Sequence, residues 1–370
     1  MNVTLVLGAR PQIIKSAPFI HLASRDKQVD LTIIHTGQHY DYEMTKTFFE
    51  ELNIPDPIVN LEVGSGTHAW QTAEIMIRLE KVLIRQRPDL ILVPGDTNST
   101  LAGALTASKL HIPVGHIEAG ARSHDRAMPE EINRRLTDHC STILFAPTKN
   151  CLENLRKEGF KNKQMFLAGD TMYDALLQCL SKAEKIDILR QLNLMKEKYV
   201  LLTLHRPENV DNPKNLEDIL KALEQIKGLL VVFPIHPRTE KQLRGSGLYG
   251  RLLKQKHVKV IKPISYYDNL NLIKNAKAVL TDSGGIQKEA FWLHTPCITL
   301  RNNTEWIETI KLKANCLTGS NTKKILQALQ QTVNDEGIKE YLRKLPNPFG
   351  DGNASKKIIE AIKTYFHQEN

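Results

Sequence analysis

Three consecutive residues, Ser283, Gly284 and Gly285, have the composition of a phosphate-binding turn. They follow a short apolar run at residues 278–280 and precede apolar residues at near-helical spacing, so they fall where a strand passes into a helix. Two glycines let the backbone approach an anion closely, and the free N–H groups at the start of a helix favour negative charge. Glu289, further along that helix, can accept hydrogen bonds from ribose hydroxyls. A serine that only caps the helix is the alternative interpretation.

Two cations, Arg10 and Lys15, lie at the start of the helix predicted after the first apolar run. In that position they can neutralise a diphosphate, and the alternative is a capped helix with two surface cations. The segment is not a Walker A loop, because the second glycine and the Lys-Ser/Thr pair are missing.

Three carboxylates occupy positions from which acid–base chemistry is possible. Asp96 and Glu118 each follow a short apolar run, and a buried unpaired carboxylate is costly, so Glu118 beside small residues favours catalysis over packing. For Asp96 a helix N-cap is the alternative. Glu131 lies in the first turn of a helix that Pro129 begins, where the helix dipole alone would account for an acidic residue.

Two histidine–arginine pairs end predicted strands in the second half of the chain. His205 and Arg206 follow one apolar run, His236 and Arg238 follow another, and Arg301 follows the run after the Ser-Gly-Gly turn. A single histidine is usually a core residue, but two such pairs at equivalent strand ends bring up to four donors together.

A phosphate anchor with nearby cations, carboxylates and a histidine suits one kind of chemistry. It favours removal of a proton from carbon or loss of a leaving phosphate, with the carboxylates as acid and base. The sequence has no metal-ligand spacing, no nucleophile elbow and no dinucleotide fingerprint. We therefore expect neither a metal nor another cofactor.

The elements that must position these residues alternate along the chain. Apolar runs separated by longer amphipathic segments predict an α/β protein with mostly parallel sheets, and two series of runs predict two doubly wound, Rossmann-like domains. The runs lie at residues 3–7, 31–35, 90–93, 114–117, 142–146, 164–168, 199–204, 229–233, 258–261, 278–280 and 297–300.

We place the N-terminal domain with the carboxylates at residues 1–169 and the C-terminal domain with the phosphate anchor at residues 170–352. A final helix at residues 353–370 is expected to pack back on the N-terminal domain. Ligands bind outside the carboxyl ends of parallel strands, so we expect the active site in the cleft between the two domains.

The composition is that of a globular protein of 370 residues, enough for two domains at ~100 to 200 residues each. Its formal charge of +9 comes from dispersed lysines and arginines, so solubilising charge or a phosphorylated small substrate explains it better than nucleic acid. No apolar run approaches the ~20 residues that span a membrane, and the N-terminus is typical of a strand rather than a signal peptide. We expect a cytoplasmic protein with five reduced cysteines, since these form no Cys-x-x-Cys pair.

A series of motifs, in order and spacing, resembles the non-hydrolysing UDP-N-acetylglucosamine 2-epimerases over nearly the whole chain. The motifs are Gly8-Ala-Arg-Pro-Gln-Ile-Ile-Lys15, His35-Thr-Gly-Gln-His39, Gly95-Asp-Thr-Asn-Ser-Thr100, His116-Ile-Glu-Ala-Gly-Ala-Arg122, Pro129-Glu-Glu-Ile-Asn-Arg134, Leu204-His-Arg206, His236-Pro-Arg238, Thr281-Asp-Ser-Gly-Gly-Ile-Gln-Lys-Glu289 and Asn347-Pro-Phe-Gly-Asp-Gly352.

The resemblance implies a fold like that of glycosyltransferase type B enzymes, in a homodimer, with UDP bound by the C-terminal domain. It implies that a base removes the proton at the second carbon of the sugar while UDP departs in an anti elimination. UDP then adds back to the 2-acetamidoglucal intermediate. The implied acid and base candidates are Asp96, Glu118, Glu131 and His205. The predicted UDP-sugar ligands are Arg10, Lys15, Arg206, His236, Arg238, Ser283, Gly284, Gly285, Glu289 and Arg301.

Gln38 and Gln71 lie in stretches that match those around a second, activating UDP-N-acetylglucosamine in several bacterial relatives, and His236 lies in another. We name Gln38 and Gln71 as possible allosteric residues on this resemblance alone.

The sequence departs from many bacterial members at Gln12, where they have Glu, and at Trp306, where they have Arg. Both departures resemble relatives that epimerise UDP-2,3-diacetamido-glucuronic acid, which is the alternative substrate. The motifs are also compatible with a hydrolysing epimerase, a glycosyltransferase or a non-catalytic UDP-sugar sensor.

Overall fold

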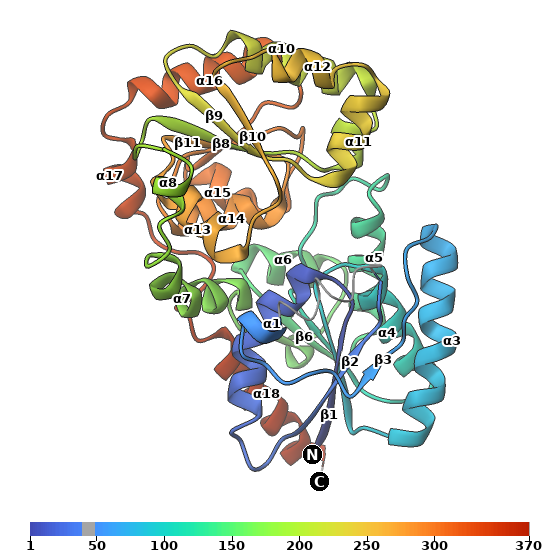
Figure 1. The fold of residues 1–370 in the computed structure, drawn as a ribbon. Helices are drawn as coiled ribbons and strands as arrows, with labels where there is room; N and C mark the ends of the chain where they lie inside the picture. Colours follow the sequence, from blue (N-terminus) through green and yellow to red (C-terminus); the bar gives the residue numbers. More distant parts are fainter. Residues whose placement is uncertain (39–48, 370) are drawn as a thin grey trace. The chain divides into compact units, whose positions relative to one another are not determined.

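The structure is a computed structural model that describes residues 1–38 and 49–369, with the side chains of residues 368 and 369 excepted. The chain forms two compact units, one made of Met1–Gln178 and Pro348–Asn370 and the other of Cys179–Asn347 (Figure 1). The first unit therefore extends past residue 169 to Gln178. Asp170 N donates to Phe349 O at 2.8 Å, a hydrogen bond that joins this stretch to the C-terminal segment of the same unit.

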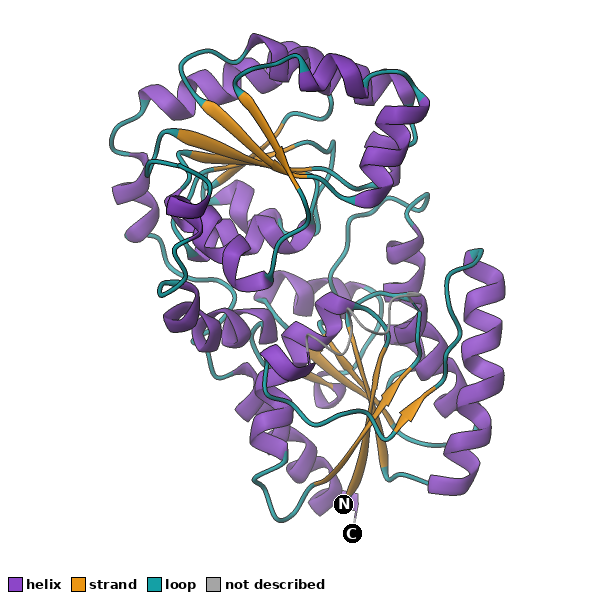
Figure 2. Cartoon of the chain, in the orientation of Figure 1, coloured by secondary structure: helices purple, strands orange, loops and turns teal. Residues whose placement is uncertain are grey.

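The first unit is built on a seven-stranded parallel sheet in the order β3-β2-β1-β4-β5-β6-β7. Its central strands are short and buried, as the apolar runs predict for a sheet covered on both faces, while β3 and β7 at the two edges are more exposed (Figure 2). The strands are β1 (Asn2–Leu7), β2 (Asp30–His35), β3 (Val59–Asn60), β4 (Leu90–Pro94), β5 (Val114–Ile117), β6 (Ile143–Ala146) and β7 (Met165–Leu167).

Helices cover both faces of this sheet. Apolar side chains of α3 and α4 pack with those of β1, β2, β4 and β5 into one core cluster. The helices of the unit with bounds in the described residues include α1 (Arg10–Ala23), α3 (His68–Gln86), α4 (Asn98–Lys109), α5 (Pro129–Cys140), α6 (Lys149–Lys157), α7 (Thr171–Ala183), which runs into the second unit, and α18 (Ala354–Glu369), and a 3₁₀ turn, η1, spans Asn162–Gln164.

The second unit repeats the plan with six parallel strands in the order β10-β9-β8-β11-β12-β13. Its strands are β8 (Tyr199–Thr203), β9 (Leu230–Pro234), β10 (Val258–Ile261), β11 (Ala278–Thr281), β12 (Cys297–Thr299) and β13 (Asn315–Leu317). In each unit the strand order reverses direction once, between β1 and β4 in the first sheet and between β8 and β11 in the second. Such a switch point leaves a crevice at the carboxyl ends of the two strands.

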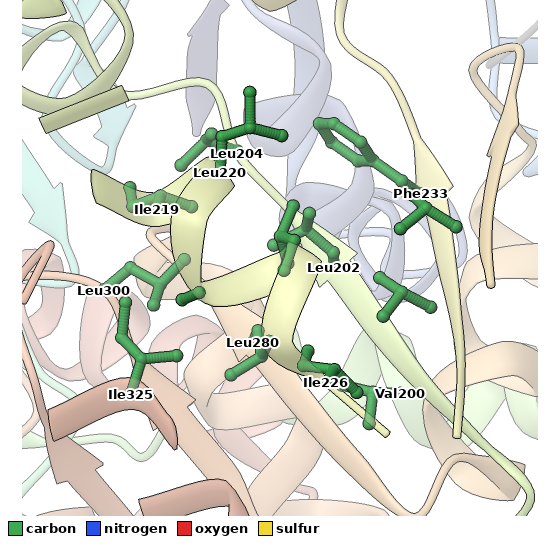
Figure 3. Packing of buried hydrophobic residues seen from close by; sticks show 14 of the residues in the cluster. Val200, Leu202, Leu204, Ile219, Leu220, Ile226, Phe233, Leu280, Leu300 and Ile325 are labelled. Atoms are coloured by element: carbon green, nitrogen blue, oxygen red, sulfur yellow. The ribbon is translucent and has the colours of Figure 1, made fainter. Parts of the chain in front are cut away.

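The core of the second unit lies where Ile219 and Leu220 of α10 meet Leu202 of β8 and Leu280 of β11 (Figure 3). The helices of this unit are α8 (Ile188–Gln191), α9 (Pro207–Val210), α10 (Pro213–Gln225), α11 (Pro237–Gly245), α12 (Tyr249–Leu253), α13 (Tyr266–Asn275), α14 (Gly284–Trp292), α15 (Ile307–Lys311), α16 (Thr322–Asn334) and α17 (Ile338–Arg343).

The C-terminal helix α18 belongs to the first unit, where it contacts α1. Asp174 of α7 accepts from the backbone N–H groups of Ala354 at 3.1 Å and Ser355 at 2.7 Å, so it supplies the N-terminal cap of α18. Further along, Lys363 forms an ion pair with Asp26. Within residues 1–38 and 49–369, none of the helices has the length and apolar character to cross a bilayer.

Candidate active site

The crevice of the first sheet is bordered by the segments that follow β1, β4 and β5. Arg10 is the first residue of α1 and is partly exposed. Asp96 follows β4, and Glu118 follows β5, the next strand of the sheet. Three of the predicted site residues therefore lie at one edge of the first unit.

Lys15 of α1 forms an ion pair with Glu118, in which Nζ lies 2.5 Å from Oε2 and the side chains are 9% and 10% exposed. Gly95 lies beside this pair, because a Cβ added there would come within 3.1 Å of Lys15 Nζ. Glu118 has a φ of +78°, a conformation that residues with side chains seldom adopt and that clusters at functional sites. Lys15, predicted as a diphosphate ligand, is the counter-ion of an acid–base candidate in this structure.

Asp96 is held by Arg134 of α5. Arg134 donates to Asp96 Oδ2 from Nε at 3.1 Å and from Nη2 at 2.7 Å, and Asn133 Nδ2 donates to the Asp96 carbonyl at 2.9 Å. The Asp96 side chain is 26% exposed. It is therefore both anchored and accessible, as an acid or base that meets a substrate must be.

Glu131, also of α5, is fully buried. Its Oε2 accepts from Ser123 N at 2.8 Å and from Arg134 Nη1 at 3.3 Å, and its Oε1 accepts from Arg135 Nε at 3.0 Å. Burial raises its pKa, but the hydrogen bonds from Ser123 and the two arginines outweigh this and hold the pKa below its usual value. In this conformation Glu131 contacts Arg134, which in turn holds Asp96.

Gln12 of α1 ties the turn after β1 to the turn after β4. Its Oε1 accepts from Gly8 N at 2.9 Å and Ala9 N at 3.0 Å. Its Nε2 donates to Pro94 O at 2.8 Å and Thr100 Oγ1 at 2.9 Å. All its hydrogen-bonding groups are thus used inside the protein, and Gln12 carries no group toward a substrate.

Gln38 and Gln71, the possible allosteric residues, also make internal bonds. Gln38 Oε1 accepts from Ser99 Oγ at 2.6 Å, while Gln71 Nε2 donates to Gln38 O at 2.9 Å and Oε1 accepts from Asn98 Nδ2 at 2.8 Å. They connect the segment after β2 to α3 and α4. His39, which ends the same motif, lies outside the described residues.

The crevice of the second sheet is organised by Asp282, a buried residue that follows β11. Its carboxylate accepts from His205 N at 3.1 Å and Arg206 N at 2.9 Å, and its Oδ1 lies 3.2 Å from His205 Nδ1. The His205 and His236 rings lie 5.8 Å apart between centroids. These contacts place three predicted residues, His205, Arg206 and His236, at the edge of the second unit.

Ser283 is the N-cap of α14, and Gly284 and Gly285 are its first two residues. The Ser283 hydroxyl accepts from Ile286 N at 3.5 Å, and Ser283 N donates to Thr281 Oγ1 at 2.9 Å. The turn has the geometry expected of either a phosphate site or a simple cap. Trp306 packs against it, because a Cβ at Gly284 would lie 3.3 Å from the Trp306 indole nitrogen.

The remaining predicted ligands of the second unit differ in exposure. Glu289 is buried, and buried Arg301 forms an ion pair with Glu305 at 3.0 Å. Arg238 is exposed and donates from Nε to Asp211 Oδ1 at 3.1 Å. The structure therefore presents Arg238 at the surface and keeps the Glu289 and Arg301 side chains inside the unit.

Trp306 takes part in a buried cation–π contact. Lys288 Nζ lies 3.9 Å from the centroid of the Trp306 ring and 5.8 Å from that of Trp292. A desolvated ammonium gains from such aromatic faces. The departure noted at Trp306 thus coincides with a lysine buried within the helix that carries the phosphate turn.

Sequence reasoning missed the residues that hold the candidates in place. Arg134, Asp282, His116 and Asp138 lie in or beside the quoted motifs, but no role was predicted for them. For Asp282, a charged residue directly after a predicted strand was the available signal, since such a residue must be paired when buried. Arg134 and Asp138 lie within a helix and His116 within a strand, where the spacing gave no such signal. Their partners depend on how the helices pack and are not visible in the spacing.

The fold and these residues define a class of protein. Two doubly wound parallel sheets, with carboxylates at one switch point and a helix-capping Ser-Gly-Gly turn at the other, are typical of proteins that bind nucleotides at the ends of their strands. Among residues 1–38 and 49–369, no group of three or more His, Cys, Asp or Glu side chains is arranged to hold a metal.

Comparison with known proteins gives the family. A family model described as UDP-N-acetylglucosamine 2-epimerase matches residues 22–363. The chain is 47% identical over 371 residues to the UDP-N-acetylglucosamine 2-epimerase of Methanocaldococcus jannaschii, covering 99% of each protein. It is 42% identical over 371 residues to the UDP-2,3-diacetamido-2,3-dideoxy-D-glucuronate 2-epimerase of Pseudomonas aeruginosa, covering 98% of this chain and 99% of that protein.

Among solved structures, the M. jannaschii UDP-GlcNAc 2-epimerase in complex with UDP-GlcNAc and UDP matches with a TM-score of 0.92 at 48% identity, covering 99% of this chain and 100% of that chain. The protein belongs to the UDP-N-acetylglucosamine 2-epimerase family. The predicted membership of this enzyme family and the predicted fold class of two Rossmann-like units are confirmed.

Proposed function

We propose that the protein interconverts UDP-N-acetylglucosamine and UDP-N-acetylmannosamine without hydrolysis. The observation that carries this proposal is the pair of anchored carboxylates, Asp96 and Glu118, at the carboxyl edge of the first sheet in a member of this family. Paired acid–base groups are what inversion at a carbon bearing an exchangeable proton requires.

The proposed reaction has two balanced steps. A base takes the proton from C2, the C1–O bond to UDP breaks with its electron pair leaving on UDP, and a C1=C2 double bond forms. In the second step UDP oxygen bonds to C1 again while a proton is delivered to C2 on the opposite face. No oxidant, metal or water is consumed.

Asp96, Glu118 and His205 are the proposed acid–base groups, and Glu131 is proposed to act by orienting Arg134. In the second unit, Ser283, Gly284 and Gly285 are proposed to bind phosphate through the start of α14, with Arg206 as a counter-charge. Glu289 is buried, so it can bind ribose only if its carboxylate becomes accessible. Of these assignments, it is the one that requires a conformational change.

The test is proton NMR of the purified protein with UDP-N-acetylglucosamine in deuterated water. We expect UDP-N-acetylmannosamine to appear with deuterium at C2, because the abstracted proton exchanges with solvent before UDP adds back. Free N-acetylmannosamine accumulating with UDP would support a hydrolysing epimerase instead. Turnover that begins only when an acceptor is added would favour a glycosyltransferase.

UDP-2,3-diacetamido-glucuronic acid is the second candidate substrate. It is favoured by the 42% identity to an epimerase of that sugar, although Gln12, one of the two departures, makes only internal bonds. Parallel assays with both sugars decide between them through kcat/KM. A higher kcat/KM with the glucuronate would make it the substrate in place of UDP-N-acetylglucosamine, with the same reaction at C2.

We also propose that the protein is a homodimer that uses α3. Trp70, Ile77 and Ile84 are 45%, 51% and 53% exposed at seven-residue spacing, so they form one apolar stripe. Sedimentation should find a dimer, and Ile77→Glu should shift it to monomer. Leu253→Glu, at an equally exposed leucine of the second unit, is the matched control and should leave the dimer unchanged.

A further inference from the structure

A connected network of charged side chains lies beneath the carboxyl edge of the first sheet. Carboxylates and arginines alternate along the path from Asp96 to Asp138, and His116 follows Asp138. In order, the contacts are Asp96–Arg134 at 2.7 Å, Arg134–Glu131 at 3.3 Å, Glu131–Arg135 at 3.0 Å, Arg135–Glu158 at 3.2 Å, Glu158–Arg122 at 2.6 Å, Arg122–Asp138 at 2.6 Å and Asp138–His116 at 2.6 Å.

His116 closes this path into a ring. It lies on β5, and its Nε2 is 2.8 Å from the carbonyl oxygen of Gly95, the residue directly before Asp96. The network thus begins at a proposed acid–base residue and returns to the backbone beside it.

The two ring nitrogens of His116 both face acceptors. Nδ1 faces Asp138 Oδ1 and Nε2 faces a backbone carbonyl, which can only accept. A neutral imidazole carries one N–H and would leave one of these contacts without a proton. Asp138 also accepts from Gly120 N at 3.1 Å and from Arg122, as an ionised carboxylate does. The geometry therefore calls for protons on both nitrogens.

Charge balance leads to the same protonation state. The ring contains four carboxylates and three arginines, so it carries a net negative charge unless His116 is an imidazolium. Both His116 and Asp138 are fully buried, where an unbalanced charge is costly.

We propose that buried His116 donates from both ring nitrogens and is a positioning residue for the reaction. Through Nε2 it holds the Gly95 carbonyl, and through Asp138 it joins the ring that ends at Arg134. Both contacts converge on Asp96. Since Glu118 follows His116 by two residues on the same chain segment, the anchored ring also limits where Glu118 can lie.

Several other charged groups surround this histidine. Lys15 Nζ lies beside Gly95 and pairs with Glu118, and His139 Nε2 of α5 lies 3.9 Å from Glu158. Lys15 and Glu118 neutralise each other, and His139 is largely exposed. They therefore leave the balance within the ring unchanged.

Neutron diffraction of the unaltered protein, crystallised at neutral pH in deuterated buffer, tests the protonation state directly. We expect deuterium on both ring nitrogens of His116 and none on Asp138. A bare Nδ1 or Nε2, or a deuterium on the Asp138 carboxyl, would overturn the proposal. This experiment does not depend on the proposed function or on any variant folding.

The positioning role is tested with His116→Gln, Asp138→Asn and the double variant, and it rests on the proposed epimerase activity. We expect His116→Gln to lower kcat about tenfold or more while KM changes by less than about threefold, since substrate ligands are untouched. The double variant leaves equal numbers of carboxylates and arginines, so it should unfold at a higher temperature than His116→Gln alone.

His139→Gln is the matched control, because this exposed histidine faces Glu158 of the same ring. It should keep kcat within about twofold, as surface ion pairs contribute little. The positioning role would be contradicted if His116→Gln and His139→Gln lost kcat equally. It would also be contradicted if the changes in unfolding temperature of His116→Gln and Asp138→Asn simply added in the double variant. If the unaltered protein shows neither C2 exchange nor turnover, the epimerase proposal is rejected, but the neutron result still holds.

Discussion

Asp96 and Glu118 are held by different kinds of partner, and this difference shapes their chemistry. Asp96 receives two N–H groups from one guanidinium, a planar cation that does not give up its proton. Glu118 pairs with an ammonium, that of Lys15, in a backbone conformation that side chains rarely adopt. Asp96 is thus oriented by a guanidinium, and Glu118 by an ion pair and by its own backbone conformation.

Replacing either carboxylate with its amide should remove acid–base catalysis while preserving shape. We expect Asp96→Asn and Glu118→Gln each to lower kcat by about 10²- to 10⁴-fold. The measurement is the rate of C2 deuterium exchange and of epimer formation. Asp89→Asn is the control, since this carboxylate lies at the other end of β4 and accepts from Asn2 N. Full activity in both Asp96→Asn and Glu118→Gln would contradict the proposed mechanism.

Glu131 should make the stability of the protein depend on pH. Burial raises its pKa, but the contacts with Ser123, Arg135 and Arg134 lower it by more than burial raises it, so the folded pKa lies below the ordinary 4.5. A depressed carboxyl pKa stabilises the fold above the ordinary value and loses that contribution as pH falls through the folded one. We therefore expect the free energy of unfolding to fall below about pH 4.5, and to fall less steeply in Glu131→Gln.

Urea unfolding at a series of pH values measures this dependence. Glu74→Gln is the control, because Glu74 forms a surface pair with Arg78 and should leave the slope as in the unaltered protein. An identical slope in Glu131→Gln and the unaltered protein would contradict the assignment.

At the scale of single elements, the C-terminal helix depends on a cap supplied from elsewhere. Asp174 of α7 accepts from the first two N–H groups of α18, far from it in sequence. A side chain of α7 therefore fixes the position of the first residue of α18. Its buried residues, Ile358 and Ile362 among them, then cover part of the first unit.

Asp174→Ala should destabilise the first unit by about 1 to 2 kcal/mol, the usual cost of a lost cap. Hydrogen exchange of residues 354–367 should accelerate in this variant. Asp351→Ala serves for comparison, since Asp351 forms an exposed pair with Lys357 near the same helix end. If the two variants exchange alike, the cap is not what secures α18.

The elements were predictable from the sequence to different degrees. Runs at residues 114–117 and 258–261 coincide with β5 and β10, because both are rich in Val and Ile, which favour strands, although they also contain His116 and Lys259. The strands β3 and β13 were missed. They are two and three residues long and contain Asn60 and Asn315, so they carry no apolar run to detect.

For the site, the strand-end positions of Asp96, Glu118 and His205 followed from parallel topology alone. Their partners did not follow. Arg134 reaches Asp96 from a helix, and Asp282 reaches His205 from another strand end, so both pairings depend on tertiary packing.

For the whole molecule, the proposal divides the work between two units, with acid–base groups in one and the nucleotide anchor in the other. UDP alone should then slow hydrogen exchange most in residues 281–289 of the second unit, since bound ligand stabilises what it contacts. Residues 215–225 of α10 give a reference within the same unit. Protection limited to the first unit would place the nucleotide elsewhere and remove the Ser-Gly-Gly assignment.

The first unit is discontinuous in sequence, because its final segment comes after the whole of the second unit. On the ribosome, α1 emerges early, but α18, which contacts it, is made only after residues 179–347. At ordinary elongation rates this interval is on the order of 10 to 30 s. During that time the second unit can fold to completion while the apolar surface that α18 covers in the first unit stays exposed, so nascent chains are most prone to aggregation and chaperone binding just before α18 is made.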